Sequence, residues 1–194
     1  YRIVGEGTKF MANIKKGNEI DIMGPLGRGY DVLSLKKGQT ALLVGGGIGV
    51  PPLYELAKQF NKRGIKTITI LGFNSKDEVF YEDEFKKFGE TYVSTVDGSV
   101  GTKGFVTDVI KKLQEENKLV FDKYYSCGPV PMLKALVNAV GEDGYISLEN
   151  RMACGIGACY ACVCKKKKKD KNKDDYSRVC YDGPVYLASD VEIE

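Results

Sequence analysis

The sequence predicts an α/β protein built around a parallel β-sheet, followed by a cysteine-rich tail. Three observations support this fold class. From residue 40 onward, short apolar runs rich in β-branched residues alternate with longer amphipathic stretches, which is the rhythm of βαβ units. A glycine-rich turn follows the first of these runs. After residue 150 the apolar periodicity stops, and four cysteines occur within the eleven positions 154–164.

Five apolar runs are candidate strands, and four amphipathic stretches between them are candidate helices. The strands are expected at 40–45, 66–73, 91–96, 123–127 and 144–149. The helices are expected at about 51–63, 80–88, 104–117 and 129–140. Together they predict one compact α/β domain over residues 37–149 with a five-stranded parallel sheet.

The segments on either side differ from this pattern. Residues 1–36 have the strands, turns and short helix expected at the end of a β-barrel, and residues 1–5, YRIVG, read as a strand already in progress. Because no initiator Met or signal peptide precedes them, we expect the chain to be a fragment of a longer protein. Residues 150–194 are expected to form a small subdomain that contains most of the cysteines.

The composition, with 43% hydrophobic and 28% charged residues, favours a soluble cytoplasmic protein, and no apolar run is long enough to predict a membrane span. Residues 165–175 hold seven Lys and three Asp, a net charge of +4; subtracting this from the total of +3 leaves −1 for the remainder. The run is interpreted as a solvated hairpin tip or as a docking patch for an acidic partner. Nucleic-acid binding is not expected, because no aromatic residues are interleaved to stack bases.

The turn after the first strand, VGGGIGVPP at 44–52, predicts a dinucleotide site. Such a turn lets backbone N–H groups approach a pyrophosphate, and the following helix adds its partial positive charge. Pro51 and Pro52 suit the first helical turn, whose N–H groups have no partner to lose. Pro52 stands where the last Gly of the usual G-x-G-x-x-G would fall, so a purely structural tight turn is the alternative. The candidate binding residues are Gly46, Gly47, Ile48 and Gly49.

Two further turns are candidate binding sites. SCGPVPM at 126–132 follows the fourth strand, so Cys127, Gly128 and Pro129 are expected beside the same crevice as the first turn. The alternative for Cys127 is a buried small apolar residue. In GEGTKFM, Gly7 and Thr8 precede a short amphipathic stretch, where a helix N-terminus with a hydroxyl at its cap could hold another phosphate. Thr is also a routine helix cap, so that signal is weak.

The cysteine spacing predicts an iron–sulfur site. Cys154-x4-Cys159-x2-Cys162, followed after seventeen residues by Cys180, matches the plant-type [2Fe–2S] pattern. A loop that wraps a cluster must point several N–H groups at the sulfurs, which explains the Gly and Ala residues between the cysteines. Cys164 is left over; a strand would point it to the same side as Cys162, but Cys180 fits the pattern better as the fourth ligand.

Other uses of the four thiols fit the sequence less well. A structural zinc site accepts four thiolates but usually has two closely spaced pairs rather than three plus one. The chain has no His, which eliminates mixed zinc sites and Rieske-type clusters. Disulfides suit small secreted scaffolds, whereas this chain already has a substantial domain.

Together these stretches resemble the ferredoxin-reductase superfamily and, more closely, the electron-transfer subunits of class B dihydroorotate dehydrogenases. The resemblance rests on GEGT, GPLGRGY, VGGGIGVPPL, CGP and RMACGIGACYACVC, which occur in the family's order along the whole chain. It implies an FAD-binding barrel of which residues 1–36 are the C-terminal remnant, an NAD domain with strand order 3-2-1-4-5, and a C-terminal [2Fe–2S] subdomain. The family's main flavin-binding strand would lie upstream of Tyr1.

The resemblance also implies roles for individual residues. Gly7 and Thr8 would contact the FAD pyrophosphate, Gly46 to Gly49 the nicotinamide dinucleotide, and Cys127 with Gly128 the nicotinamide near the flavin, where Cys127 is the candidate catalytic residue. The preference for NAD over NADP is implied by the family alone. After the second strand, Ser75 and Lys76 could meet a 2′-phosphate, whereas Asp77 and Glu78 would repel one.

The implied function is electron transfer in pyrimidine biosynthesis. Electrons would pass from dihydroorotate to the flavin of an FMN-containing catalytic subunit, then through the cluster and FAD to NAD+, within a heterotetramer. The flavin is needed because NADH exchanges a hydride, whereas a [2Fe–2S] cluster exchanges single electrons. Two alternatives remain at this point: the flavin and iron–sulfur subunit of a related sulfide dehydrogenase or ferredoxin–NADP transhydrogenase, and a zinc-binding interaction protein with a vestigial nucleotide domain.

Overall fold

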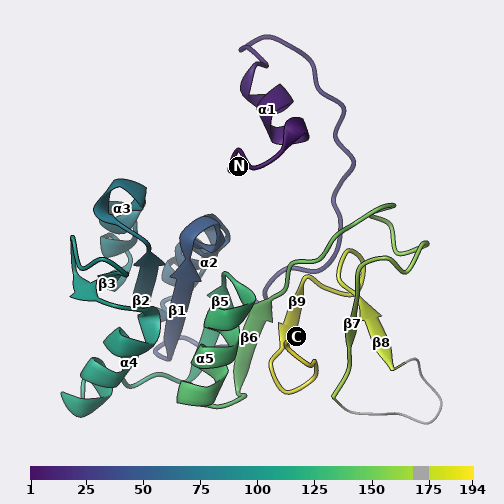
Figure 1. The fold of residues 1–194 in the computed structure, drawn as a ribbon. Coiled ribbons are helices and arrows are strands. Elements are labelled where there is room, and N and C mark those ends of the chain that lie inside the picture. The colour runs from purple at the N-terminus through teal and green to yellow at the C-terminus, as the bar shows by residue number, and fades with distance from the viewer. Residues whose placement is uncertain (168–174) are drawn as a thin grey trace.

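The computed structural model describes residues 1–167 and 175–194, and its centre is a seven-stranded sheet (Figure 1). The five predicted strands occur as β1 (Thr40–Gly46), β2 (Lys66–Phe73), β3 (Gly89–Thr95), β5 (Lys123–Cys127) and β6 (Gly144–Ser147). They pair in parallel in the order β3-β2-β1-β5-β6, which is the expected order 3-2-1-4-5. Two strands that the sequence did not predict extend the sheet: β4 (Thr102–Lys103), parallel to β3, and β9 (Val185–Leu187), antiparallel to β6.

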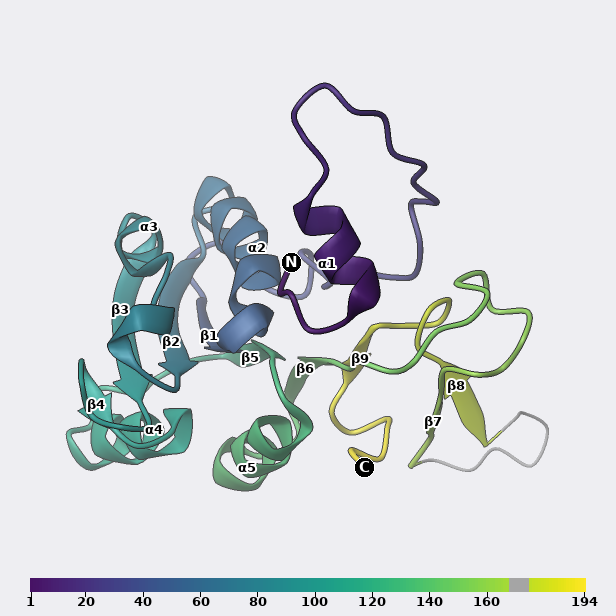
Figure 2. The ribbon, with the colours of Figure 1, turned by 45° about the horizontal axis from the view of Figure 1, so that its top comes forward.

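Four helices cover both faces of this sheet. Successive side chains of β1 point to opposite faces and pack against different pairs of helices. Ala41 and Leu43 pack with residues of α2 (Val50–Lys62) and α3 (Glu82–Lys86). Leu42 and Val44 pack on the opposite face with residues of α4 (Val106–Glu115) and α5 (Val130–Val140). Figure 2 shows these two helical layers on either side of the sheet. Burial on both faces is why β1 reads as a continuous apolar run.

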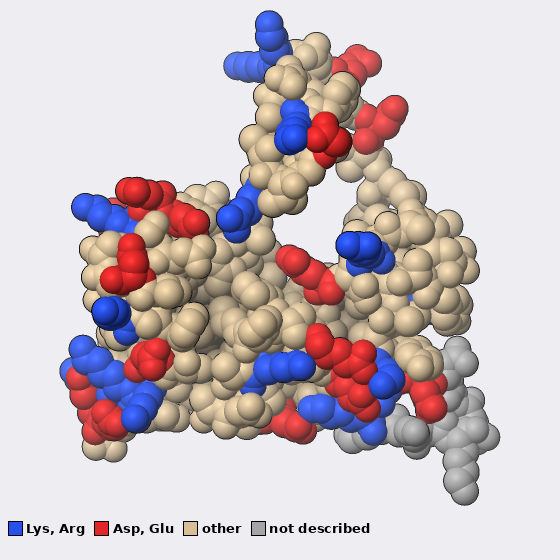
Figure 3. All heavy atoms as spheres, in the orientation of Figure 1, with Lys and Arg blue, Asp and Glu red and all other residues tan. Residues whose placement is uncertain are grey.

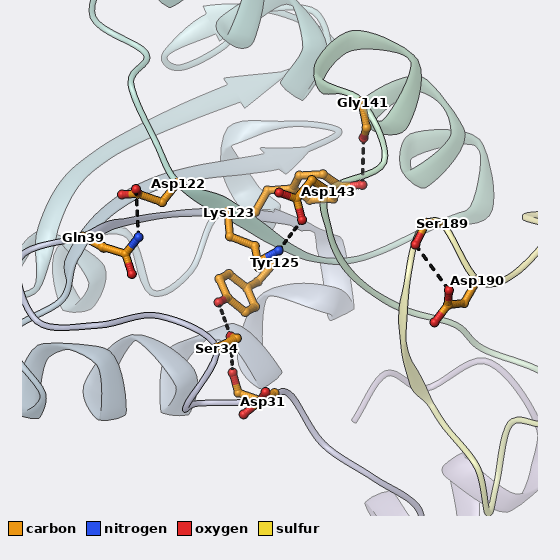
Figure 4. A network of polar contacts seen from close by, with 11 residues as sticks. Asp31, Ser34, Gln39, Asp122, Lys123, Tyr125, Gly141, Asp143, Ser189 and Asp190 are labelled. Atoms are coloured by element: carbon orange, nitrogen blue, oxygen red, sulfur yellow. Dashed lines mark hydrogen bonds and ion pairs between the residues drawn. The ribbon is translucent and has the colours of Figure 1, made fainter.

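Polar contacts tie the amino-terminal ends of the central strands together, as Figure 4 shows. Asp122 accepts hydrogen bonds from the Gln39 side chain at 3.0 Å and from the Thr40 backbone N–H at 2.7 Å. Lys123 forms an ion pair with Asp143 between β5 and β6. The Ser34 and Tyr125 hydroxyls lie 2.7 Å apart. These contacts lie at the edge of the sheet opposite the two glycine turns.

The N-terminal segment differs from the expectation. In residues 1–36, all of which the structure describes, α1 (Glu6–Ala12) is formed, but the strand expected at 1–5 is not. A strand exists only where a neighbour accepts and donates its backbone hydrogen bonds, and no strand lies beside residues 1–5. Figure 1 shows α1 standing away from the sheet, and none of its residues is buried.

The tail contributes one strand to the main sheet. It contains the antiparallel pair β7 (Val163–Lys165) and β8 (Tyr176–Arg178), the hairpin expected to return Cys180 to the other cysteines. Its strand β9 completes the main sheet, and Cys162 and Cys180 lie in the same hydrophobic cluster as Leu42. Within the described residues, no helix is long and apolar enough to cross a membrane.

Candidate functional site

A cavity of about 510 Å³ opens at the carboxyl-terminal ends of the parallel strands, where ligands of open α/β sheets bind. Both predicted glycine turns reach it. Of the predicted residues, it is lined by Gly46, Gly47, Ile48, Gly128 and Pro129. Gly49 and Cys127 lie behind this lining. Residues that sequence reasoning did not single out for the cavity include Arg2, Asn74, Phe105 and Glu149.

The glycines are needed because the two turns touch. A Cβ on Gly46 would lie 2.5 Å from the Met132 sulfur. A Cβ on Gly49 would lie 2.2 Å from the carbonyl oxygen of Cys127, which is closer than any real carbon contact. Gly49 therefore serves the contact between the turns rather than opening toward the cavity. Val50 begins α2 directly behind this turn, with Pro51 and Pro52 in its first turn as expected.

Glu78 is the acidic side chain after β2 that reaches the cavity. Its carboxylate accepts a hydrogen bond from the Asn74 amide at 2.8 Å, and both residues line the cavity. The described lining does not include Ser75, Lys76 or Asp77. The sequence alone gives no reason to prefer Glu78 over these three residues. Spacing alone could not separate Asp77 from Glu78, because both lie on the short 3-10 helix at 76–78.

Cys127 ends β5 and is 5% exposed, in a core cluster with residues of α2. Burial raises the pKa of its thiol, so the group is neutral near pH 7. The negative charge of Glu149, which does line the cavity, also raises the pKa of this thiol. The side chain thus has the surroundings of the buried small residue that was the alternative, whereas Gly128 beside it faces the cavity.

Gly7 and Thr8 lie in the first turn of α1, away from this cavity. Gly5, not Thr8, is the N-cap residue, which corrects the expected position of the hydroxyl. The Thr8 hydroxyl instead accepts hydrogen bonds from the backbone N–H groups of Val4 at 2.9 Å and Gly5 at 3.1 Å. Nothing lies within 4 Å of the position that a Cβ on Gly7 would occupy.

The tail brings four cysteines together as two pairs. The backbone N–H of Cys159 donates to the Cys154 sulfur, and that of Cys180 to the Cys162 sulfur, both at 3.4 Å. The N–H groups of Cys159 and then Ile156 and Ala158 lower the pKa of Cys154 to about 6. The negative charges of Cys162 and Cys154 both help to raise the pKa of Cys180. The Cys154–Cys159 pair therefore lies next to the Cys162–Cys180 pair. Among the described residues, no three metal-binding side chains converge on one point.

The loop that carries three of these cysteines depends on unusual backbone conformations. Gly155 has φ of +71° and Gly157 of +80°, a region that favours glycine, and Tyr160 adopts φ of +57°. Arg178 holds this loop from outside by donating a hydrogen bond to the Gly157 carbonyl at 2.9 Å. Sequence reasoning missed Arg178, because the contact joins residues twenty-one positions apart.

Cys164 lies apart from the two pairs. It belongs to β7, opposite Ser177, and burial raises the pKa of its thiol. Its side chain packs against the hydrophobic cluster and faces the Tyr186 hydroxyl. Cys180, by contrast, has its backbone N–H on the Cys162 sulfur, so the geometry favours Cys180 as the fourth member of the set.

Most of the lysine run, residues 168–174, lies outside the described residues. At its start, Lys165 forms an ion pair with Glu194 at 2.9 Å, and Lys167 forms one with Glu142 at 2.7 Å. On the face drawn in Figure 3, acidic and basic side chains are interspersed. This face thus fits the nearly neutral body that the charge count predicts.

Two protein-family models match the chain. Residues 43–138 match an oxidoreductase NAD-binding domain. Residues 149–192 match the iron–sulfur cluster binding domain of dihydroorotate dehydrogenase B. The first range contains the cavity-lining residues of both glycine turns, although Arg2 and Glu149 of the lining fall outside it, and the second contains all four paired cysteines.

Curated relatives cover the whole chain. It is 94% identical over 194 residues to the electron transfer subunit of dihydroorotate dehydrogenase B (NAD(+)) from Fusobacterium nucleatum, and it covers 73% of that protein. It is 56% identical over 187 residues to the subunit of the same description from Lysinibacillus sphaericus, covering 96% of this chain and 70% of that one.

Solved structures share the fold. A structure of NADH-dependent reduced ferredoxin–NADP oxidoreductase, described with flavin-based electron bifurcation, superposes with a TM-score of 0.84 and 32% identity over 99% of this chain and 67% of that one. The cytochrome b5 reductase domain of Ulva prolifera nitrate reductase has a TM-score of 0.56 at 16% identity, over 73% of this chain and 63% of that one, which indicates the fold alone.

Proposed function

The chain belongs to the family of electron-transfer subunits of NAD-dependent dihydroorotate dehydrogenase B, and from this premise we propose which of its residues hold the groups between which electrons pass. The function is that of an oxidoreductase subunit, and an electron-transfer subunit implies a separate catalytic subunit. This family membership leaves neither the related flavin subunits nor a zinc-binding interaction protein as a competing function.

We propose that NAD occupies the cavity at the carboxyl-terminal edge of the sheet. Gly46, Gly47 and Ile48 would place backbone N–H groups along the pyrophosphate, at the start of α2. Gly128 and Pro129 would line the nicotinamide side, with Gly49 keeping the two turns in contact. Cys127 would shape the nicotinamide side of the cavity through its backbone and its packing, because its thiol is buried and neutral.

The pairing of the four cysteines is the observation that carries the cluster proposal. A [2Fe–2S] cluster needs two thiolates on each iron, so Cys154 with Cys159 would bind one iron and Cys162 with Cys180 the other. A single zinc ion would instead need all four thiolates around one point. The N–H groups already directed at Cys154 suit a ligand that must be deprotonated.

FAD is the third proposed group. The first turn of α1 offers backbone N–H groups without intrahelical partners, and the open space beside Gly7 would let a pyrophosphate approach them. Thr8 would hold that turn through its bonds to Val4 and Gly5. Flavins exchange electrons singly or in pairs, which is the chemistry needed between a hydride carrier and a one-electron cluster.

The surface around the cysteines fits a partner subunit. Cys159 is exposed, and the side chains of Met152, Ile156, Tyr160 and Tyr181 near it are 61%, 54%, 49% and 51% exposed. Exposed aromatic and Met side chains are typical of interface cores. We infer that the FMN-containing catalytic subunit docks here, in the proposed heterotetramer, because electron transfer to its flavin requires the cluster to lie close to the interface.

The decisive test combines metal analysis with EPR on anaerobically purified protein, before and after dithionite. We expect two irons and two labile sulfides per chain, and a rhombic signal that develops only on reduction. Cys180→Ser should lose this signal, whereas the matched variant Cys164→Ser should retain it. One zinc per chain without iron would overturn the cluster proposal, and loss of the signal in Cys164→Ser alone would overturn the ligand assignment.

A further inference from the structure

Arg178 makes an unusual set of contacts beside the cysteine loop. It ends β8, two residues before Cys180. Its Nε lies 3.0 Å from one carboxylate oxygen of Asp182 and its Nη2 lies 3.3 Å from the other. The guanidinium also lies over the rings of Tyr160, at 5.3 Å, and Tyr181, at 4.6 Å.

These contacts fix the plane of the guanidinium and leave its Nη1 group for the loop. Two parallel hydrogen bonds to one carboxylate fix the orientation of an Arg side chain more tightly than a single hydrogen bond does. The two tyrosines restrain it from its faces. The remaining donor, Nη1, is thereby aimed at the carbonyl oxygen of Gly157, 2.9 Å away.

The orientation of that carbonyl determines the orientation of the next N–H. In a trans peptide the C=O and the following N–H lie in one plane and point in opposite directions. When Arg178 holds the Gly157 carbonyl outward, the Ala158 N–H of the same peptide must point inward. There it meets the Cys154 sulfur, beside the Cys159 N–H that lies 3.4 Å from the same atom.

We propose that Arg178 is a positioning residue that sets the reduction potential of the cluster by holding the peptide between Gly157 and Ala158. The inference rests on the proposed [2Fe–2S] site. Reduction adds one electron and makes and breaks no bond, so it increases the negative charge on the iron and sulfur atoms by one unit. A properly aimed N–H group stabilises the more negative state and therefore raises the potential.

Arg178 could also change the reduction potential simply through its positive charge. Two variants separate this charge effect from the positioning effect. Arg178→Lys keeps the charge but lacks the planar fork, so a charge effect predicts no change and positioning predicts a lower potential. Asp182→Asn removes a negative charge, which by electrostatics alone would raise the potential. Positioning predicts that it lowers the potential, because the fork that aims Arg178 is lost.

The experiment is an EPR-monitored redox titration of the iron-replete protein. At the wild-type midpoint, the ratio of reduced to oxidised cluster should fall about tenfold in Arg178→Gln, which is a shift of about 59 mV for one electron. Arg178→Lys and Asp182→Asn should shift in the same direction. Lys165→Gln, an equal loss of charge on the same hairpin but at an ion pair with Glu194, should leave the ratio unchanged.

The outcomes discriminate clearly. An unchanged midpoint in Arg178→Lys, or a raised one in Asp182→Asn, would overturn the positioning role while leaving the cluster in place. Loss of iron from Arg178→Lys would also count against it, because the role assigned to Arg178 is to tune the cluster rather than to retain it. Absence of iron and sulfide from the wild-type protein would instead overturn the proposed function itself.

Discussion

Glu78 and Asp77 show how much a single side chain's position matters. They are neighbours on one short helix and carry the same charge, yet the Glu78 carboxylate lines the cavity, where Asn74 holds it at 2.8 Å. An acidic side chain after the second strand accepts hydrogen bonds from the ribose of NAD and repels the 2′-phosphate of NADP. Glu78 is therefore the residue expected to determine the choice of dinucleotide.

We expect Glu78→Gln to bind 2′-phospho-ADP-ribose about tenfold more tightly, or about 1.4 kcal/mol, because the repulsion between two negative groups is removed. Its affinity for ADP-ribose should fall a few-fold, because an amide accepts hydrogen bonds from the ribose less strongly than a carboxylate. Isothermal titration calorimetry with both ligands measures the ratio. Asp77→Asn is the matched control, and an equal change in both variants would show that position on the helix is irrelevant.

At the residue scale, the sequence predicts candidate ligands but not the residues that support them. The spacing of Cys154, Cys159, Cys162 and Cys180 is enough for that prediction, because the loop between the first three is local and short. The contact of Arg178 with Gly157 could not be predicted, since it depends on how β8 returns to the loop. The same holds for Glu78, whose direction is set by the turn at 76–78.

A helix or strand can be predicted from the sequence when it forms from local residues. It is harder to predict when it depends on residues far away in the chain. The five parallel strands were predicted from local apolar runs, whereas their order was predicted only from the family resemblance, and the sheet has that order. The helix expected at 80–88 begins only at Glu82, because Tyr81 has φ of +65° and its ring packs on Tyr54. Strand β9 is three partly exposed residues long and exists only because β6 offers it an edge.

The contact between the two glycine turns leads to a prediction about Gly49. Its φ of −75° is ordinary, so Gly49→Ala adds no backbone strain, but the new Cβ would lie 2.2 Å from the Cys127 carbonyl oxygen. The turns must separate, and we expect a loss of about 2 kcal/mol in the free energy of unfolding. Affinity for ADP-ribose should fall with it.

Urea denaturation and calorimetry measure the two effects. Gly29→Ala is the matched control, because nothing lies within 4 Å of its Cβ position and its φ is not positive. A Gly49→Ala variant as stable as Gly29→Ala would contradict the close contact between the turns.

Over the whole molecule, the cysteine tail and the nucleotide domain behave as one packed unit. One hydrophobic cluster contains Cys162, Val179 and Cys180 together with core residues of β1, α4 and α5. A cluster bound to these cysteines would therefore stabilise the sheet as well as the tail, since any group that binds only the folded state raises its stability.

We expect removal of iron by a chelator under reducing conditions to lower the melting temperature of the whole chain by several degrees, at about 2–4 °C per kcal/mol. The measurement is circular dichroism at 222 nm, because all the described α-helices precede the cysteine tail. Protein treated with the same chelator without reductant is the control. An unchanged helical transition would mean that the tail unfolds independently.

The pairing of β9 with β6 also affects how the polypeptide is synthesised. The boundary between the two matched family domains lies before residue 149, but the sheet of the first is complete only once residues 185–187 have left the ribosome. By then all four cysteines have already emerged, so iron delivery can begin on a nascent chain whose β6 edge is still open. A nonsense mutation soon after Cys180 would leave all four proposed ligands in place and yet expose that edge to aggregation.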